Sequence, residues 1–382
     1  MATYNFDKKT AEEISRVPHN DGATKLDGWM NVLTGLGIRG RDKNVNAHFR
    51  MERVFEQAEL DQLYRSDGVT RRIIDIVPAE MIRQGWEIEG DSDQEINSKM
   101  EEIKTNQNLT TLLRWARLYG GALCVMGIAD GLPLDEPVDE RNIRDVKWLH
   151  VFDRYQSFSR DGTFEKDLNN PNYGFPNVYT VNDSRTGAIF YVHHSRILRT
   201  DWSLLPPRQQ NFNNGWGDPL LQSTYDELRN YSTAFANAGL IMQDFVNYTL
   251  SIPNLAELIS SQCADNQVMK RLDILNLTKG ATNTMILDAE EKYEKASTNI
   301  SGIPELLDRF MLALSAVSGV PVSLLFGRSA AGMNATGDND VRNFYDMVKQ
   351  EQESKLKPML EKLTRYIMLS KDGSFAGVEP DN

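Results

Sequence analysis

Three long helical patterns in the second half of the chain constrain its fold more than any other feature of the sequence. Apolar residues recur at helical spacing over residues 218–246, from Pro304 to Gly319, and over about 339–369. A compact insertion, Tyr248–Asp288, follows the first pattern and precedes the second, and a strip of small residues separates the second from the third. We therefore expect a long helix, an inserted subdomain, a second helix, a small-residue loop and a last helix that Pro358 kinks.

Local signals refine this layout. Asp218-Pro219 is a suitable N-cap and first-turn pair for the first helix, and Gly319 is expected to close the second. Inside the insertion, the sequence predicts a strand in YTLSIP, a helix around Leu255–Asn276 and a strand in NTMILD. The insertion is thus expected to be a small unit of mixed structure.

The first part of the chain, up to about residue 200, predicts an α+β arrangement. A helix is expected from Leu60 to Gly85, kinked or split by Pro78, and another from Ser98 to Tyr119, where Gly120-Gly121 stops it. The expected strands are Trp86–Glu89, Ala122–Ile128, Val146–Phe152, Asn177–Val181, Ala188–Val192 and Arg196–Arg199. These strands predict a mostly antiparallel sheet. Residues 1–50 predict a partly ordered arm, and the Pro-, Asn- and Gly-rich stretch from residue 203 a domain boundary.

The charge balance limits the possible functions. The 382 residues carry 42 Lys and Arg against 54 Asp and Glu, a formal net charge of −12. Such a chain is poorly suited to neutralising DNA phosphates, but an acidic surface would keep DNA mobile beside it. We expect no membrane span, no secretory signal and no disulfide, with Cys124 as a buried thiol and folding in the cytoplasm.

A possible phosphate-binding loop lies in the small-residue strip, because Gly327 to Gly332 matches G-x-x-x-x-G. A Walker loop needs Lys and then Ser or Thr after the second glycine, and it follows a strand. Here Met333 and Asn334 follow, and a helical pattern precedes the strip. The sequence therefore argues against a nucleotide site, and leaves open a flexible connector without a role of its own.

No enzyme motif is evident elsewhere. His193-His194, before Ser195, is the one histidine cluster, and neighbouring residues of a strand should point to opposite faces and share no metal. Acidic pairs such as Asp338 and Asp340 suit a helix start better than a metal site. We therefore expect no catalytic residue, no metal and no cofactor.

Several segments, in their order along the chain, resemble the portal proteins of tailed bacteriophages. They are LYRSDGVTRRIIDIVPAEMIRQGWEIEG, YGGALCVMGI, HSRILR, GDPLLQSTYDELRNY and FMLALSAVSGVPVSLLFGRSAAGMNATGDNDVRNFYDMVKQEQESKLKPMLEKL. The resemblance covers roughly residues 55–370. It is to a portal family that was formerly a domain of unknown function and is linked to anti-CBASS-type proteins.

This resemblance implies a portal fold with an α/β wing, a two-helix stem, a small α/β clip and a long kinked C-terminal helix. On this chain it implies an N-terminal arm (1–50), the wing (51–217), a first stem helix (218–247), the clip (248–300), a second stem helix (301–322), a tunnel loop (323–337), a wing-spanning helix (338–370) and a crown stub or truncated end (371–382).

The resemblance also implies a function. Portal proteins form a ring, usually of twelve subunits, at one capsid vertex, and double-stranded DNA passes through it during packaging and ejection without sequence-specific recognition. The implied partners are the terminase large subunit, a head–tail adaptor, and the major capsid and scaffolding proteins, with no membrane. The implied location is the virion, after assembly in the host cytoplasm.

The tunnel loop is the candidate functional site. Its small side chains and single cation would touch passing DNA without holding it tightly. The residues expected to face the DNA are Gly327, Arg328, Ser329, Ala330, Ala331, Gly332, Met333, Asn334 and Thr336.

Two other interpretations stay open. One is an enzyme similar to a cyclic-nucleotide phosphodiesterase, because some relatives of this family are linked to proteins that degrade cyclic-nucleotide defence signals. That chemistry would need two H-x-T/S motifs, and only His193-His194-Ser195 comes near one. The other is a structural adaptor that never forms a channel.

Overall fold

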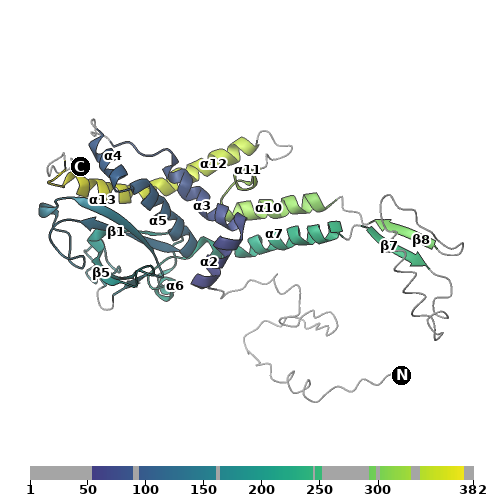
Figure 1. Cartoon of the computed structure of the whole chain (residues 1–382), viewed down its shortest axis with the longest axis horizontal. Helices are drawn as coiled ribbons and strands as arrows, with labels where there is room; N and C mark the ends of the chain where they lie inside the picture. The colour runs from purple at the N-terminus through teal and green to yellow at the C-terminus, as the bar shows by residue number, and fades with distance from the viewer. Residues whose placement is uncertain are drawn as a thin grey trace, which may run out of the picture. The chain divides into compact units, whose positions relative to one another are not determined.

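The computed structural model describes residues 54–88, 94–160, 164–243, 246–251, 292–297, 302–327 and 336–373. The chain divides into two units, Met1–Val54 and Phe55–Asn382, and all described residues except Val54 belong to the second. Helices and antiparallel strands are mixed in this second unit, which confirms the expected α+β class (Figure 1).

Four helices lead into the first sheet: α2 (Gln57–Ser66), α3 (Gly68–Arg83), α4 (Glu95–Glu102) and α5 (Thr105–Tyr119). Of the expected kink or split at Pro78, the split does not occur, since α3 continues through this residue. The neighbouring Val77 and Met81 are fully buried, and this packing holds the helix together across the proline. The chain breaks instead at Asp67, whose carboxylate caps α3 by accepting a hydrogen bond from the Thr70 N–H at 2.7 Å.

Two further expectations for this part are wrong. The helix predicted over Ser98–Tyr119 is two helices, because Lys104 adopts a left-handed conformation with φ of 55° between α4 and α5. Residues 86–88, which were expected in a strand, have no regular secondary structure. Trp86 and Ile88 pack instead against the main core.

The first sheet has the strand order β2-β1-β6 and is antiparallel throughout. The strands are β1 (Gly121–Ile128), β2 (Val146–Asp153) and β6 (Ile197–Asp201). Every residue of β1 is buried, in agreement with its nearly uninterrupted apolar sequence. Cys124 is a free, buried thiol, as expected, and burial raises the pKa of this thiol to about 12.

The second sheet consists of β3 (Ser157–Ser159), β4 (Val178–Asn182) and β5 (Ile189–His193), again antiparallel. Its inner side chains form a separate small core with residues of β1 and β2. Trp216, with 1% of its surface exposed, lies in this core although it belongs to the stretch after residue 203, which also contains α6 (Pro207–Phe212). Gly120, with φ of 95°, lets this stretch approach closely, because a Cβ there would lie 2.4 Å from the Gly217 carbonyl oxygen.

The remaining elements follow the predicted order. They are α7 (Leu220–Gln243), β7 (Val246–Ser251), β8 (Lys292–Ser297), α10 (Ile303–Ser318), α11 (Val322–Phe326), α12 (Thr336–Glu351) and α13 (Lys357–Met368). Strands β7 and β8 pair in antiparallel register from Val246↔Ser297 to Ser251↔Lys292, and β8 was not expected from the sequence. The helix predicted around Leu255–Asn276 and the strand in NTMILD lie outside the described residues.

The last long helix is interrupted, but Pro358 is not where the irregularity begins. A π-helical segment, Gln352–Leu356, separates α12 from α13. Pro358 follows it as the second residue of α13, and the N–H that it lacks cannot bond to a carbonyl of the preceding turn. The Gln352 side-chain amide donates a 2.6 Å hydrogen bond to the Met81 carbonyl, which fixes the segment against α3.

Candidate functional site

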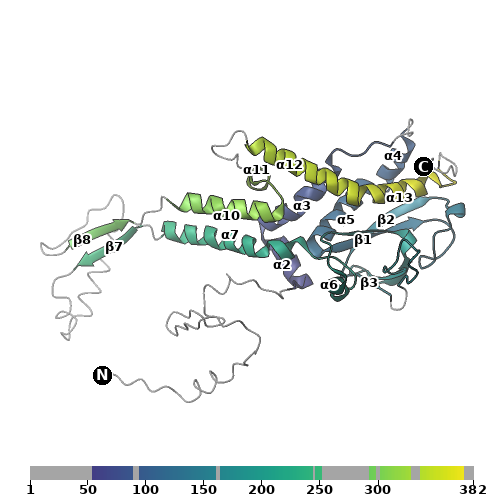
Figure 2. The same cartoon turned by 180° about the vertical axis from the view of Figure 1, so that it is seen from behind.

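Helices α7 and α10 form the first candidate surface. They lie side by side in both views (Figures 1 and 2) and pack directly on each other. The beginning of α7 is anchored, since Leu221 and Leu228 are buried in the cores beside α5. The end of α10 is anchored as well, through the fully buried Leu314. These two anchored ends lie together at one end of the antiparallel pair, and beyond them the pair is largely exposed (Figure 1).

Large apolar side chains remain on the outside of this pair. Phe235 and Leu240 of α7 are each 58% exposed, and Leu306 and Leu312 of α10 are 55% and 57% exposed. Single apolar surface residues are ordinary, but four large ones on two adjoining exposed helices provide apolar area that a protein–protein contact can use. The helical pair therefore leaves apolar surface that another protein chain could cover.

The junction after α10 is held by buried polar groups. Arg117 of α5 donates hydrogen bonds to the Ile73 carbonyl at 3.0 Å and to the Ser318 carbonyl at 3.4 Å. Burial lowers the pKa of Arg117 to about 9, which still leaves it charged at neutral pH. A cation at the last carbonyls of α10 also complements the helix dipole. Arg117 therefore connects α3, α5 and the end of α10.

Both ends of the small-residue strip are fixed to the same core. Before it, the Leu325 side chain is buried, and Arg72 Nε donates a 2.9 Å hydrogen bond to the Leu324 carbonyl. The Phe326 ring lies 5.2 Å from that of Tyr231 on α7. After the strip, Phe344 of α12 is buried in the main core. The helices on both sides of the strip are thus anchored in the same core, and α11 also contacts α7 through Phe326.

Of the residues expected to face DNA, the structure describes two. Gly327 is exposed and ends α11 with φ of 69°, a conformation that favours glycine. Thr336 is the first residue of α12. The others, from Arg328 to Asn334, lie outside the described residues, so their role as a tunnel loop stays a prediction.

The histidine cluster differs from its expected geometry. The rings of His193 and His194 lie 4.3 Å apart between centroids, because the chain leaves β5 and turns into a short 3-10 helix, His194–Arg196. The expectation that they point to opposite faces is therefore wrong. Burial is the main cause that lowers the pKa of His194 to about 4, so its ring is neutral at pH 7. Within the described ranges, no group of three His, Cys, Asp or Glu residues could hold a metal ion.

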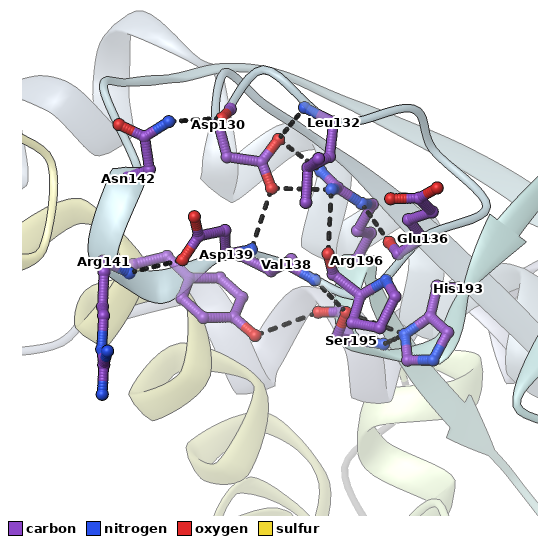
Figure 3. Close-up of polar contacts among 12 residues, drawn as sticks. Asp130, Leu132, Glu136, Val138, Asp139, Arg141, Asn142, His193, Ser195 and Arg196 are labelled. Carbon is purple, nitrogen blue, oxygen red and sulfur yellow. Dashed lines mark hydrogen bonds and ion pairs between the residues drawn. The ribbon is translucent and has the colours of Figure 1, made fainter.

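The Ser195 hydroxyl is committed to structural contacts. It accepts a 3.0 Å hydrogen bond from the Val138 N–H and lies 3.0 Å from His193 Nδ1 (Figure 3). The Ser195 N–H points to the same ring nitrogen at 3.2 Å. A nucleophile needs a free hydroxyl beside its base, together with a second polar group for the reacting atom. These contacts instead fix the turn at the end of β5.

Beside this turn lies a buried ion pair that the sequence analysis did not identify. Arg196 and Asp130 are joined at 2.7 Å, and both side chains are fully buried (Figure 3). The carboxylate also accepts hydrogen bonds from the N–H groups of Leu132 and Asp139, at 3.2 and 3.0 Å. Burial alone would raise the pKa of Asp130, but Arg196 and these N–H groups outweigh it and hold the pKa below its usual value. The pair fixes the loop between β1 and β2.

A family model described as "Phage portal protein" matches residues 58–382. The chain belongs to the phage portal protein family. The match begins near the start of α2 and includes every later helix and strand, which places the helical pair and the strip after it inside the portal family region.

Among curated proteins, the chain is 30% identical over 364 residues to "Anti-CBASS protein Acb1" of Caulobacter sp. (strain RHG1). That match covers 91% of this chain and 57% of the relative. A protein of the same name from Sphingomonas paeninsulae is 27% identical and is covered to 56%. The chain thus spans little more than half the length of these two relatives.

Solved structures with a similar fold come from the necks of particles. The chain matches one from the "Neck of native GTA particle computed with C12 symmetry" with a TM-score of 0.53 and 14% identity, over 84% of both chains. A second match, from the "Neck of empty GTA particle computed with C6 symmetry", has a TM-score of 0.54 and 13% identity, over 84% of this chain and 83% of that one. In the described part of this portal family member, no helix is long and apolar enough for a bilayer.

Proposed function

We propose that this chain forms a ring of about twelve copies at a capsid vertex, through which double-stranded DNA enters and leaves the particle. The observation that carries this proposal is the apolar surface of the α7–α10 pair, on which Phe235, Leu240, Leu306 and Leu312 stay exposed. Family membership and the likeness to chains from particle necks support it.

A closed ring requires a head-to-tail contact, in which each subunit presents two different faces to its two neighbours. Two adjoining helices with outward apolar residues on both satisfy this requirement, because α7 can meet α10 of the next copy. Apolar burial contributes about 25 cal/mol per Å², so repeated contacts of this kind would stabilise the ring. The strip between Gly327 and Thr336 would then be repeated around the axis and form a collar.

The collar would contact DNA loosely. Portal function requires that DNA slides, and the excess of acidic residues in the chain disfavours tight binding to phosphates. We further propose that the segment from β7 to β8 and the wing provide the docking surfaces for the terminase large subunit, a head–tail adaptor, and capsid and scaffolding proteins. In this account the protein itself catalyses nothing, and the packaging motor is a separate protein.

Charged substitutions in the helical pair test the ring. The double change Phe235→Asp and Leu312→Asp puts carboxylates where the contact requires apolar surface, and should convert rings into monomers without unfolding the subunit. Sedimentation velocity measures the oligomer, and circular dichroism measures the fold. Leu168→Asp is the matched control, since Leu168 is 77% exposed in a wing loop outside the pair. Rings that persist in the double variant at the level of the control would contradict the proposal.

No described residue supports the enzymatic alternative. The hydroxyl of Ser195 is engaged by Val138 and His193, and the one nearby histidine pair supplies no second H-x-T/S motif. The two curated relatives named anti-CBASS proteins are longer, and this chain spans little more than half of their length. Their name therefore gives no activity to this chain. We therefore propose no catalytic role for it.

A further inference from the structure

A groove of about 860 Å³ runs along β6 in the wing, away from the α7–α10 pair. One wall is α13 and the π-helical segment before it, and the other wall is the stretch that leads into β4. The groove-lining residues used below are Phe175, Tyr179, Trp202, Leu204, Met359 and Lys362. Its size is within the range of pockets that hold a ligand or a short peptide.

The floor of the groove offers free backbone groups. Strand β6 is an end strand of its sheet and pairs only with β1 in the described part of the chain. The Trp202 N–H donates a 3.1 Å hydrogen bond to the Gly120 carbonyl, just before β1. In an antiparallel pair every second residue directs its N–H and C=O groups toward the partner strand, so Thr200 and Leu198 do the same. The backbone groups of Arg199 and Asp201 therefore point the other way, and no described backbone group bonds to them there.

A lysine without a countercharge borders this open edge. Lys362 of α13 donates hydrogen bonds to the Ile197 carbonyl at 2.8 Å and to the His194 carbonyl at 3.1 Å. No described carboxylate pairs with it, and burial lowers the pKa of its ammonium group to about 8. An ammonium group has three N–H donors, so one remains for an incoming acceptor. A carboxylate there would restore the charge balance.

The other charges of the groove are balanced within the described part of the chain. Apolar side chains make up much of the remaining lining, together with polar ones such as Asn172, Thr200 and Ser354. Arg199 is paired with Asp201 at 3.0 Å, and Lys355 is paired with Glu351 and lies 4.5 Å from the centre of the Trp202 ring. Leu204 is 83% exposed at the rim, and Met359 is buried in the wall. The groove therefore combines an open strand edge, one unbalanced cation and apolar walls.

We propose that an extended acidic segment of a partner protein binds in this groove as an added strand beside β6. Its backbone would pair with the outward groups of Arg199 and Asp201, one carboxylate would accept a hydrogen bond from Lys362, and alternate apolar side chains would lie against Trp202 and Met359. This is the strand-addition mode of peptide recognition, in which main-chain pairing gives affinity and side-chain pockets give selectivity. The proposal does not depend on ring formation.

Peptide binding tests this with the purified full chain. The probe is fluorescein-labelled Val-Asp-Val-Asp-Val-Asp, compared with Val-Asn-Val-Asn-Val-Asn, and binding is followed by fluorescence anisotropy. We expect saturable binding of the acidic peptide only. Lys362→Met should weaken it about tenfold or more, the size expected for a hydrogen bond to a charged group. Lys357→Met is the control, because Lys357 lies on the same helix with its side chain 66% exposed and paired with Glu361.

Two further peptides test the strand pairing. One carries N-methyl groups on the valines and the other on the aspartates, so each blocks one edge of the peptide backbone. We expect one of the two to lose binding. Equal binding of both, equal binding of the Asn peptide, or equal effects of Lys362→Met and Lys357→Met would overturn the proposal. A different outcome is that no peptide binds, and that the Lys362→Met variant fails to form the rings that the wild-type chain forms. The groove would then be a contact between subunits, and the proposal would be wrong.

Discussion

At the scale of single residues, a buried ion pair holds the loop between β1 and β2 to the start of β6. Asp130 and Arg196 are 66 positions apart in the sequence, and both side chains are fully buried. Each also bonds the backbone of the intervening loop, as Arg196 Nε does to the Glu136 carbonyl at 2.8 Å. Nothing in the sequence marks such a pair, because many Asp and Arg residues are available at similar separations.

Removal of one partner of this ion pair should strongly lower the free energy of unfolding. Asp130→Ala leaves the Arg196 guanidinium buried without its countercharge, and we expect a loss of about 3–5 kcal/mol in the free energy of unfolding. Chemical denaturation of the purified protein measures it. Glu140→Ala removes the partner of Arg365 in an ion pair whose side chains are 43% and 48% exposed, and should cost at most about 1 kcal/mol. A similar small loss for both variants would contradict the structural role of Asp130.

The buried histidine at the end of β5 predicts a pH dependence. Burial, with help from His193 and Lys362, lowers the pKa of His194 from 6.5 to about 4 in the folded protein. The unfolded chain therefore binds more protons between these values, and stability should fall as the pH drops from about 6.5 to 4. Denaturation at a series of pH values should show this slope, and His194→Gln should reduce it. An NMR titration that finds His194 protonated at pH 6 would contradict the assignment.

At the scale of elements, the sequence predicted best where a pattern was local and its ends were marked. Strand β1 is an apolar run that begins after Gly120, and α10 ends where Gly319 adopts a left-handed conformation with φ of 70°. The errors arose where tertiary contacts decide. Lys104 takes a conformation that is rare for its residue type, and β8 is a polar strand, KYEKAS, whose partner β7 is far away in the sequence.

The strip between α11 and α12 is the element on which the proposed channel function depends. Deletion of Ser329–Asn334 should leave rings intact, because the flanking Leu325 and Phe344 are buried in the core and fix both ends. Particles assembled with this variant should contain less DNA, or lose it faster, when DNA per particle is measured by quantitative PCR after nuclease treatment. The control replaces the same six positions with glycine and serine. Loss of rings on deletion would show that the strip is a packing element.

At the scale of the whole molecule, the α+β class and the portal fold could be predicted from the order of the elements and from the family resemblance. The exposed apolar residues of α7 and α10 could be predicted only in part, because their stripes are visible in the sequence but the side that remains uncovered depends on how the two helices pack. The β6 groove could not be predicted, since Lys362 meets the strand edge across 165 positions of sequence.

Ring closure of this subunit around an axial channel is the part of the proposed function from which the rest follows. Cryo-electron microscopy of the purified chain, with particle mass measured in parallel by mass photometry, tests it most directly. We expect end views with about twelve-fold rotational symmetry and an open centre, and a mass near twelve times the 43.4 kDa of one chain. Monomers at every concentration, or closed oligomers without an axial opening, would contradict it.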